Sequence, residues 1–485
     1  MEWTTATGDW VGRWVFLRAL AAVYLVAFLV AVNQVRPLLG ERGLLPVSRF
    51  VGAVPFRRSP SLFHRWSSDR ALVGASWVGV VVSAALLVGA ADVAPAPVGM
   101  ALWLVPWVLY LSLVNVGQRW YAFGWETLLC EAGFLAVFLG PADVAPPVVV
   151  LVLLRWLLFR VELGAGLIKL RGDPCWRDLT CLRYHHETQP LPGPLSWWFH
   201  HLPPRLHQVE VAANHGAQLV LPFLLFAPQP VAAVAALLMA VTQGWLVLSG
   251  NFSWLNVLTI ALCLPVMGPL LAPLLPLGPP DPLPATPPWH QVAVWVLLAV
   301  VGLLSIRPAR NLVARRQRMN TSYDPLRLVN SYGAFGSITR VRHEVVVEGT
   351  IDDDLATATW REYAFKGKPG DPSRRPRQVA PYHLRLDWLM WFAALSPGRR
   401  EPWFRPFVEA LLRGDRAVLG LLDGDPFAGE RPTWVRARVE EYRFTTREER
   451  RATGDWWVRR PVGDHLPPVR LHATASPSDE RPRRT

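Results

Sequence analysis

Long apolar runs separated by short polar segments fill the first 306 residues, and no apolar run of comparable length follows them. The hydrocarbon core of a bilayer is about 30 Å thick, so a helix needs about 20 apolar residues to cross it. The pattern therefore predicts a polytopic α-helical membrane bundle of about nine spans in residues 1–306. The predicted spans are residues 13–33, 71–92, 99–116, 124–140, 147–170, 210–228, 231–249, 253–274 and 290–306.

After residue 306 the membrane pattern gives way to the mixed pattern of a water-soluble fold. Residues 307–331 form a basic connector, and residues 332–465 are predicted to form a small β-rich (α+β) soluble domain. The tail, residues 466–485, is rich in Pro, Arg and Ser. That composition is typical of disordered segments, so we expect the tail to be disordered.

Two strands and two helices are predicted inside the soluble domain. Segments 337–350 and 433–445 are β-branched and largely alternate apolar with polar residues, which indicates strands. Segments 384–395 and 402–413 lie between them and end at Gly or Pro signals, which indicates short helices.

Loop charges predict which side of the membrane each loop occupies. The loop 34–70 holds seven arginines and should be cytoplasmic, because basic loops stay inside. Counting nine spans from there places the N-terminus outside and the C-terminal domain inside. The net charge is +13, and most of the excess lies after Arg307. Arginines beside membrane helices are explained by lipid head groups, so we expect the lipid bilayer as a partner and no nucleic acid.

Composition also bears on the source of the chain. Only three of its 50 basic residues are Lys, and Ala, Val, Gly and Pro are abundant. This bias suggests a GC-rich bacterial genome and therefore an integral protein of the bacterial cell membrane.

Charged side chains inside the predicted spans form a candidate network. An ionisable residue in a spanning helix costs about 2.5–3.5 kcal/mol on insertion scales, so each needs a partner or a role. Arg155, Glu162 and Lys169 are spaced seven apart and line one helix face. The network is either an ion-pair lock between helices or the lining of a polar cavity. Its predicted members are Glu126, Glu131, Arg155, Arg160, Glu162 and Lys169, with Glu126 and Glu131 as partners for Arg155 and Arg160.

The segment 171–215 is the most distinctive part of the chain, because it is aromatic and holds six of the twelve histidines. Trp176, Trp197 and Trp198 fit the aromatic belt at a membrane surface, and a short amphipathic helix is expected around 194–202. Cys175 and Cys181 are a candidate disulfide. The residues predicted to form a recognition loop are Arg171, Asp173, Trp176, Arg177, Asp178, Tyr184, His185, His186, Glu187 and Gln189.

Two kinds of chemistry are open for this segment besides recognition. His185, His186 and Glu187 are candidate metal ligands, but their spacing matches no standard site and adjacent residues diverge on a helix, so no metal is predicted. Lys169, His185, His186 and Glu187 are the candidate catalytic residues, because a histidine or lysine there could act as a general base. We expect no cofactor.

Several motifs resemble the lipase maturation factor family. They are FRVELGAGLIKLRGDPCWRDLTCLRYHHETQPLPGPLSWWFHHLP (159–203), NHGAQLVLPFLLF (214–226), SGNFSWLNVLTI (249–260) and WREYAFKGKPGDPSRRPRQVAPYHLRLDWLMWFAAL (360–395). The resemblance implies a membrane-bound maturation or folding factor for client proteins, lipases among them. Animal members reside in the endoplasmic reticulum membrane, and their soluble domain is expected on the lumenal side. That expectation conflicts with the charge count, which places the domain inside.

Two functions from different classes remain open. The first is a non-enzymatic maturation factor that binds clients through the 171–209 loop and the soluble domain. The second is a membrane-embedded enzyme related to the vitamin K-dependent carboxylase fold and acting on lipid or protein. A hydrolase is not indicated, because the chain has no G-x-S-x-G nucleophile motif.

Overall fold

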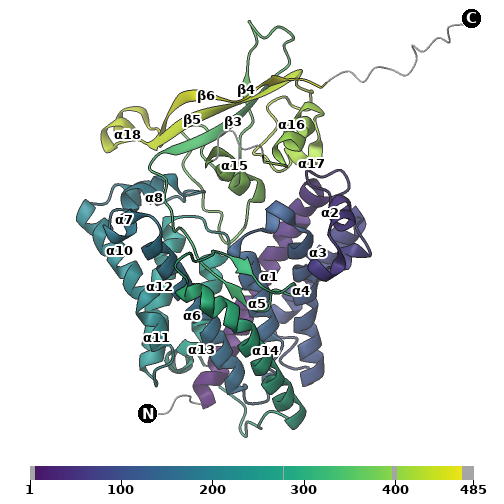
Figure 1. The fold of residues 1–485 in the computed structure, drawn as a ribbon, viewed down its shortest axis with the longest axis vertical. Coiled ribbons are helices and arrows are strands. Elements are labelled where there is room, and N and C mark those ends of the chain that lie inside the picture. Colours follow the sequence, from purple (N-terminus) through teal and green to yellow (C-terminus); the bar gives the residue numbers. More distant parts are fainter. Residues whose placement is uncertain (1–5, 277, 396–400, 472–485) are drawn as a thin grey trace, which may run out of the picture.

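A computed structural model describes residues 6–276, 278–395 and 401–471. A helical bundle forms one end of the molecule and a β-rich domain caps the other (Figure 1). Six helices of the described residues are long and apolar enough to cross a membrane. They are α1 (Ala6–Leu39), α3 (Asp69–Leu87), α4 (Ala96–Val116), α12 (Val231–Ser249), α13 (Leu255–Leu271, continued by η4, Ala272–Leu274) and α14 (Pro288–Val313).

The predicted count of nine spans is not confirmed, because three of the predicted segments fall short of these criteria. Helix α5 (Gly124–Ala136) has 13 residues and is about 20 Å long at 1.5 Å per residue. Helix α6 (Val148–Arg171) is long enough but carries Arg155, Arg160 and Glu162. Helix α10 (Pro204–Leu219) is largely polar and has 16 residues, and the helix that follows it, α11 (Leu221–Leu224), has four.

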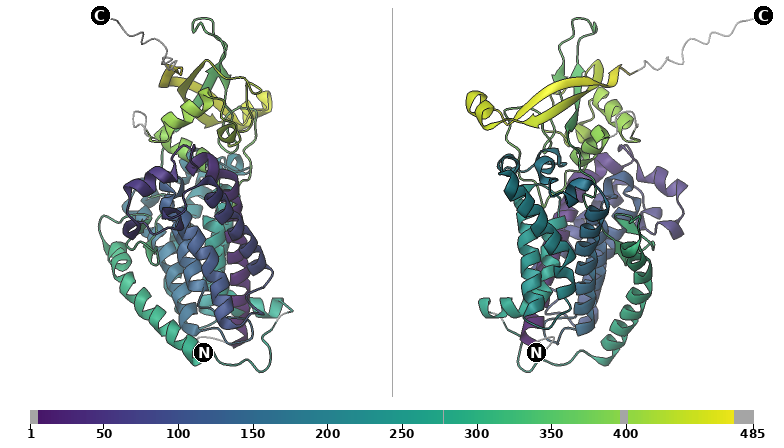
Figure 2. Two further views of the ribbon diagram at one scale, coloured as in Figure 1. Left: turned by 90° about the vertical axis from the view of Figure 1, so that its right-hand side faces the viewer. Right: turned by 60° about the vertical axis from the view of Figure 1, so that its left-hand side comes forward.

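The packing of the bundle is uneven. Helix α1 lies against α3 and α13, and most of its side chains are buried. Helix α14 lies along one side of the bundle beside α6 and is largely exposed (Figure 2). Exposed apolar side chains on α14, such as Val292, Trp295 and Leu303, suit contact with lipid.

Short helices form the end of the bundle that faces the β-rich domain (Figure 1). The Arg-rich loop 34–70 lies at this end, whereas α1 begins at the opposite end, so the loop and the β-rich domain lie at the same end of the bundle. The short helices of this end are α2 (Val47–Ala53), η1 (Phe56–Arg58), η2 (Leu62–His64), η3 (Gln118–Tyr121), α7 (Pro174–Arg177), α8 (Leu182–Thr188) and α9 (Ser196–His200).

The β-rich domain is built on a four-stranded antiparallel sheet in the order β4-β3-β5-β6. Its strands are β3 (Arg342–Thr350), β4 (Arg361–Glu362), β5 (Trp434–Phe444) and β6 (Trp457–Val469), and a separate pair joins β1 (Thr321–Ser322) to β2 (Asn330–Ser331). The helices are α15 (Arg385–Leu395), α16 (Phe404–Leu412), α17 (Arg416–Leu419) and α18 (Arg447–Thr453). The predicted strands and helices of this domain are therefore confirmed.

Local signals explain how the last two strands are joined. Thr446 and Glu449 form a capping box at the start of α18, and Gly454 ends the helix at a φ of 81° that favours glycine. Strand β6 then runs to Val469, so the prediction that disorder begins at residue 466 is wrong for residues 466–469. The rest of the predicted tail, residues 472–485, lies outside the described residues.

Candidate functional site

The segment 171–215 lies where the bundle meets the β-rich domain, between α6 and the sheet (Figure 1). It contains α7, α8 and α9 and the first part of α10. Three sets of polar residues lie in or near this segment, and they differ in how their charges are satisfied.

The first set joins α5, α6 and the connector, and we name it the Glu131 cluster: Glu131, Arg160, Asn330 and Tyr332. Arg160 forms a fully buried ion pair with Glu131. The same carboxylate accepts hydrogen bonds from the Asn330 backbone and side-chain nitrogens, both at 3.0 Å, and from the Tyr332 hydroxyl at 2.7 Å. Arg160 also donates to the Asn330 carbonyl at 2.6 Å. The carboxylate is thus surrounded by donors.

The second set fastens α15 of the β-rich domain into the bundle. Arg385 is fully buried and forms an ion pair with Glu126 of α5 at 2.7 Å. Its guanidinium also lies 3.5 Å from the centre of the Tyr121 ring, and the Tyr110 hydroxyl donates to Glu126. The prediction that Glu126 pairs with Arg155 or Arg160 is therefore wrong. Arg155 instead donates to the Leu225 carbonyl at 3.3 Å.

The remaining charges of α6 meet neutral amides. Glu162 accepts from Gln243 at 2.7 Å, and Lys169 donates to Asn214 at 2.7 Å and to Gln218 at 2.8 Å. The Lys169 ammonium also lies 4.8 Å from the centre of the Trp176 ring. These contacts hold α6 to α10 and α12.

Several residues of the predicted recognition loop hold the β-rich domain in place. Asp173 caps α7 and forms an ion pair with Arg340 at 2.8 Å, while Arg340 lies over the Tyr184 ring. Arg342 of β3 is buried and donates to the carbonyls of Glu187, Gln189 and Pro190. Cys175 and Cys181 are joined in a disulfide, which closes the loop between α7 and α8.

The tryptophans of this segment do not form the predicted membrane belt. Trp176 is buried and donates to the Phe335 carbonyl at 2.8 Å, and Trp197 is buried and donates to the Thr445 carbonyl at 2.9 Å. Trp198 packs against Trp456 and lies under Arg375. The predicted amphipathic helix is the five-residue α9, and its indoles face the β-rich domain rather than lipid.

Burial also determines the charge of the candidate catalytic residues on α8. Burial lowers the pKa of His185 to about 3, with a smaller effect from Lys169, and lowers the pKa of His186 well below its usual value. The pKa of Glu187 is raised to about 7 by burial, although its carboxylate accepts a hydrogen bond from the Phe444 backbone nitrogen at 2.6 Å. His185 packs between Phe252 and Phe335. The two imidazoles are therefore neutral at pH 7.

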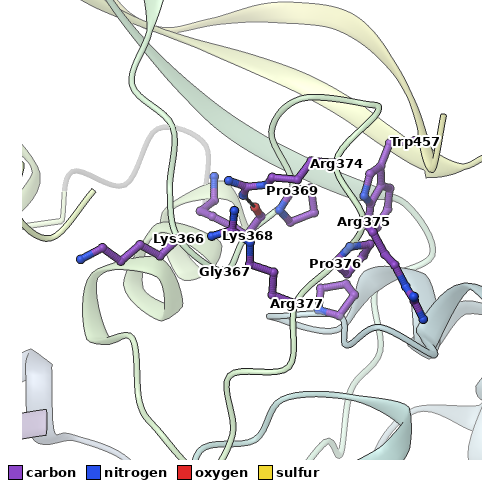
Figure 3. A pocket seen from close by; sticks show the side chains of 10 residues that line it. Lys366, Gly367, Lys368, Pro369, Arg374, Arg375, Pro376, Arg377 and Trp457 are labelled. Carbon is purple, nitrogen blue, oxygen red and sulfur yellow. Dashed lines mark hydrogen bonds between the residues drawn. The ribbon is translucent and has the colours of Figure 1, made fainter. Parts of the chain in front are cut away.

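A shallow basic pocket lies in the β-rich domain between residues 366 and 377 (Figure 3). Its cations contact acceptors of the protein itself. Lys368 pairs with Glu344 at 2.6 Å, Arg374 pairs with Asp423 at 2.7 Å, and Lys366 donates to the Gly420 carbonyl at 2.6 Å. The pocket therefore holds these three cations in contacts within the protein.

The third set was not predicted from the sequence, and we name it the histidine cluster: His186, His207 and Glu210. Their ligand atoms lie within 4.8 Å of one another. His207 and Glu210 stand three residues apart on α10, which places them on one helix face, but His186 precedes His207 by 21 residues. That spacing matches no standard metal motif. The sequence therefore showed the pair on α10 but not the third residue that meets it.

Comparisons with known proteins cover nearly the whole chain. Residues 11–269 match the lipase maturation factor transmembrane domain, and residues 328–467 match the lipase maturation factor C-terminal domain. The chain is 40% identical to lipase maturation factor 1 of Mus musculus over 95% of its own length and 88% of that protein. It is 41% identical to the Bos taurus protein of the same name, over 95% and 89% of the two chains. Identity to lipase maturation factor 2 of Homo sapiens is 30%, over 96% and 83%.

These relatives also bear on two earlier expectations. They are animal proteins, so they do not support the predicted bacterial origin or the bacterial cell membrane. None of them is named a carboxylase, so they give no support to the carboxylase-like alternative. No solved structure matches the chain.

Proposed function

Because the chain belongs to the lipase maturation factor family, we propose that it is an integral membrane factor that assists the folding or assembly of secreted lipases. The observation that carries the proposal is the extent of the likeness, which includes both the membrane bundle and the β-rich domain. The buried ion pair between Glu126 and Arg385 supports it further, because it fastens the two parts into one unit.

We place the client contact on the exposed charged edge that runs from the end of α6 to α8, formed by Arg171, Arg177, Asp178 and Arg183. Asp173 and Glu187 of the predicted recognition loop are engaged with the β-rich domain, whereas these four charged side chains are exposed to solvent. A charged edge steers partners and fixes their orientation.

The test is complementation in cells that lack lipase maturation factor 1 and express a secreted dimeric lipase. We expect the chain to restore secreted lipase activity, and the double variant Arg177→Glu/Asp178→Lys to restore at least fivefold less at equal protein level. The matched control is Arg451→Glu on α18, which changes an exposed charge away from this edge. A chain that is made and folded but leaves lipase secretion unchanged would contradict the maturation role; equal rescue by the double variant would contradict the contact site.

We further propose that the chain resides in the endoplasmic reticulum membrane with its β-rich domain in the lumen. The disulfide between Cys175 and Cys181 supports this side, because disulfides persist in oxidising compartments. The opposite prediction, a cytoplasmic β-rich domain, rested on the arginines of loop 34–70. Because this loop lies at the same end as the β-rich domain, our proposal places the loop in the lumen as well.

Two engineered glycosylation sites at opposite ends of the molecule test the orientation. Leu355→Asn creates an Asn-Ala-Thr acceptor in the exposed hairpin between β3 and β4, and Pro284→Asn creates the same acceptor in the loop before α14. In microsomes we expect a glycosidase-sensitive mass shift, beyond that of the unaltered chain, for Leu355→Asn alone. A shift for Pro284→Asn alone would place the β-rich domain in the cytosol.

A further inference from the structure

The histidine cluster combines three potential ligands with little access to water. Glu210 Oε2 lies 3.1 Å from His207 Nδ1 and 4.0 Å from His186 Nε2. His186 and His207 are each 2% exposed, and the side chain of Glu210 is 10% exposed. Two imidazoles and one carboxylate form the ligand set of an open tetrahedral zinc site, in which the fourth position takes water.

His186 carries the unexplained feature of this cluster. Neither of its ring nitrogens has a hydrogen-bond partner among the residues that the structure describes. A buried polar atom left without a partner costs about 1–3 kcal/mol, so such an atom requires an explanation. The ring packs against Phe199 and His207, which hold it in the cluster.

The neighbours of the other two residues orient lone pairs toward the same point. His207 Nε2 lies 3.3 Å from the His200 carbonyl, and donation there leaves Nδ1 as an acceptor facing Glu210. Trp245 donates its indole N–H to Glu210 Oε1 at 2.8 Å, which leaves Oε2 facing the histidines. Hydrogen bonds of this kind to the outer atoms of ligands are the usual second layer of a metal site.

We propose that His186 Nε2, His207 Nδ1 and Glu210 Oε2 bind a zinc ion that joins α8 to α10. Ligand atoms around tetrahedral zinc are about 3.3 Å apart at metal–ligand distances of about 2.0–2.1 Å, so small side-chain movements close the present spacing. Calcium and magnesium do not suit the site, because they require oxygen ligands.

The position of the site suggests its effect. Glu187 follows His186 on α8 and accepts a hydrogen bond from Phe444 at the end of β5. A zinc ion at His186 therefore fixes α8, and with it one attachment of the β-rich domain. This inference does not rest on the proposed lipase clients, since metal binding is measured on the protein alone.

The experiment measures zinc in the full-length protein, purified in detergent through a tag without histidines. We expect about one zinc per chain by mass spectrometry of the metal. His186→Gln and Glu210→Gln should each lower zinc affinity more than the 10–100-fold that an outer partner costs, and Trp245→Phe should lower it about 10–100-fold. His215→Gln is the matched control, because this half-buried histidine of α10 lies outside the cluster and should leave the zinc content unchanged.

Two results would overturn the proposal. The first is an unaltered protein that binds no stoichiometric zinc at micromolar free zinc, and the second is a His186→Gln variant that binds as much as the unaltered protein. If the variants fail to fold, Co²⁺ added to the unaltered protein decides. A tetrahedral site gives intense visible absorption, and its absence would show that His207 and Glu210 form an ordinary ion pair.

Discussion

The Glu131 cluster and the histidine cluster are both buried and both lie near the β-rich domain. Each contains one carboxylate, but the groups that face this carboxylate differ. In the Glu131 cluster a carboxylate is surrounded by donors from Arg160, Asn330 and Tyr332. In the histidine cluster a carboxylate faces two ring nitrogens, and His186 has no donor or acceptor within hydrogen-bond reach among the described residues. Donors from the protein itself satisfy the carboxylate of the first cluster, whereas a cation joins the carboxylate and the imidazoles of the second.

The largest expected effect comes from breaking the ion pair of the Glu131 cluster. Glu131→Gln leaves Arg160 buried without a counter-charge, and the loss of one partner of a buried pair costs about 3–5 kcal/mol. We expect little monodisperse protein by size exclusion in detergent. The double variant Glu131→Gln/Arg160→Gln should recover part of the loss.

The exposed Asp178→Asn variant is the control for the loss of one carboxylate and should behave like the unaltered chain. Equal loss in the Glu131→Gln single variant and in the double variant would mean that the pair contributes no coupling, which would remove the contrast between the clusters.

A smaller effect is expected at the disulfide beside the histidine cluster. Cys175 and Cys181 are six residues apart, and closing so short a loop stabilises a fold by about 2 kcal/mol in the chain-entropy description. The variant Cys175→Ser/Cys181→Ser should therefore lower the thermal midpoint while the protein remains monodisperse. An unchanged midpoint in both oxidising and reducing buffer would show that the disulfide adds no measurable stability to the other contacts of α7.

The smallest effect concerns protonation of His200, whose Nε2 lies 3.7 Å from Glu187. Burial lowers the pKa of His200 to about 4, and neighbouring His201 and His207 lower it further. The unfolded chain then binds the extra proton below about pH 6.5, so the folded state loses stability as pH falls. The cost is about 0.7 kcal/mol from this one group between pH 7 and pH 6.

Glu187 acts in the opposite direction, because its raised pKa of about 7 makes the folded state the better proton binder in this range. The measurement is therefore the difference between His200→Gln and the unaltered chain. We expect the variant to lose less thermal stability from pH 7 to pH 6. Parallel losses in the two proteins would contradict a buried neutral His200.

Much of the fold followed from the pattern of apolar residues. The six apolar helices and the strands β3 and β5 lie where the pattern placed them, whereas the longest strand, β6, was not predicted. The nine-span count went further than the pattern allowed at α5, since hydropathy does not reveal that the helix ends after 13 residues. Segment 384–395 was correctly predicted as a helix, but its Arg385 enters the bundle and meets Glu126, a contact across 259 residues.

The site was harder to predict, because its partners are distant along the chain. The sequence singled out His186 but compared it with its neighbours His185 and Glu187. The side chains that meet it, His207 and Glu210, lie on another helix. A spacing of three on α10 was visible, but which loop folds back onto it depends on packing.

Gln34, near the end of α1, connects this helix to residues that lie 349 or more positions later in the sequence. Its side chain donates to the His383 carbonyl at 2.7 Å and accepts from the Arg385 backbone nitrogen at 3.1 Å. A ribosome adds about 5–20 residues per second, so Gln34 waits roughly 20–70 s for these partners to be made. During synthesis α1 therefore enters the membrane long before the side-chain amide of Gln34 can form these hydrogen bonds. The β-rich domain supplies the partners only after the helices of the bundle have been made.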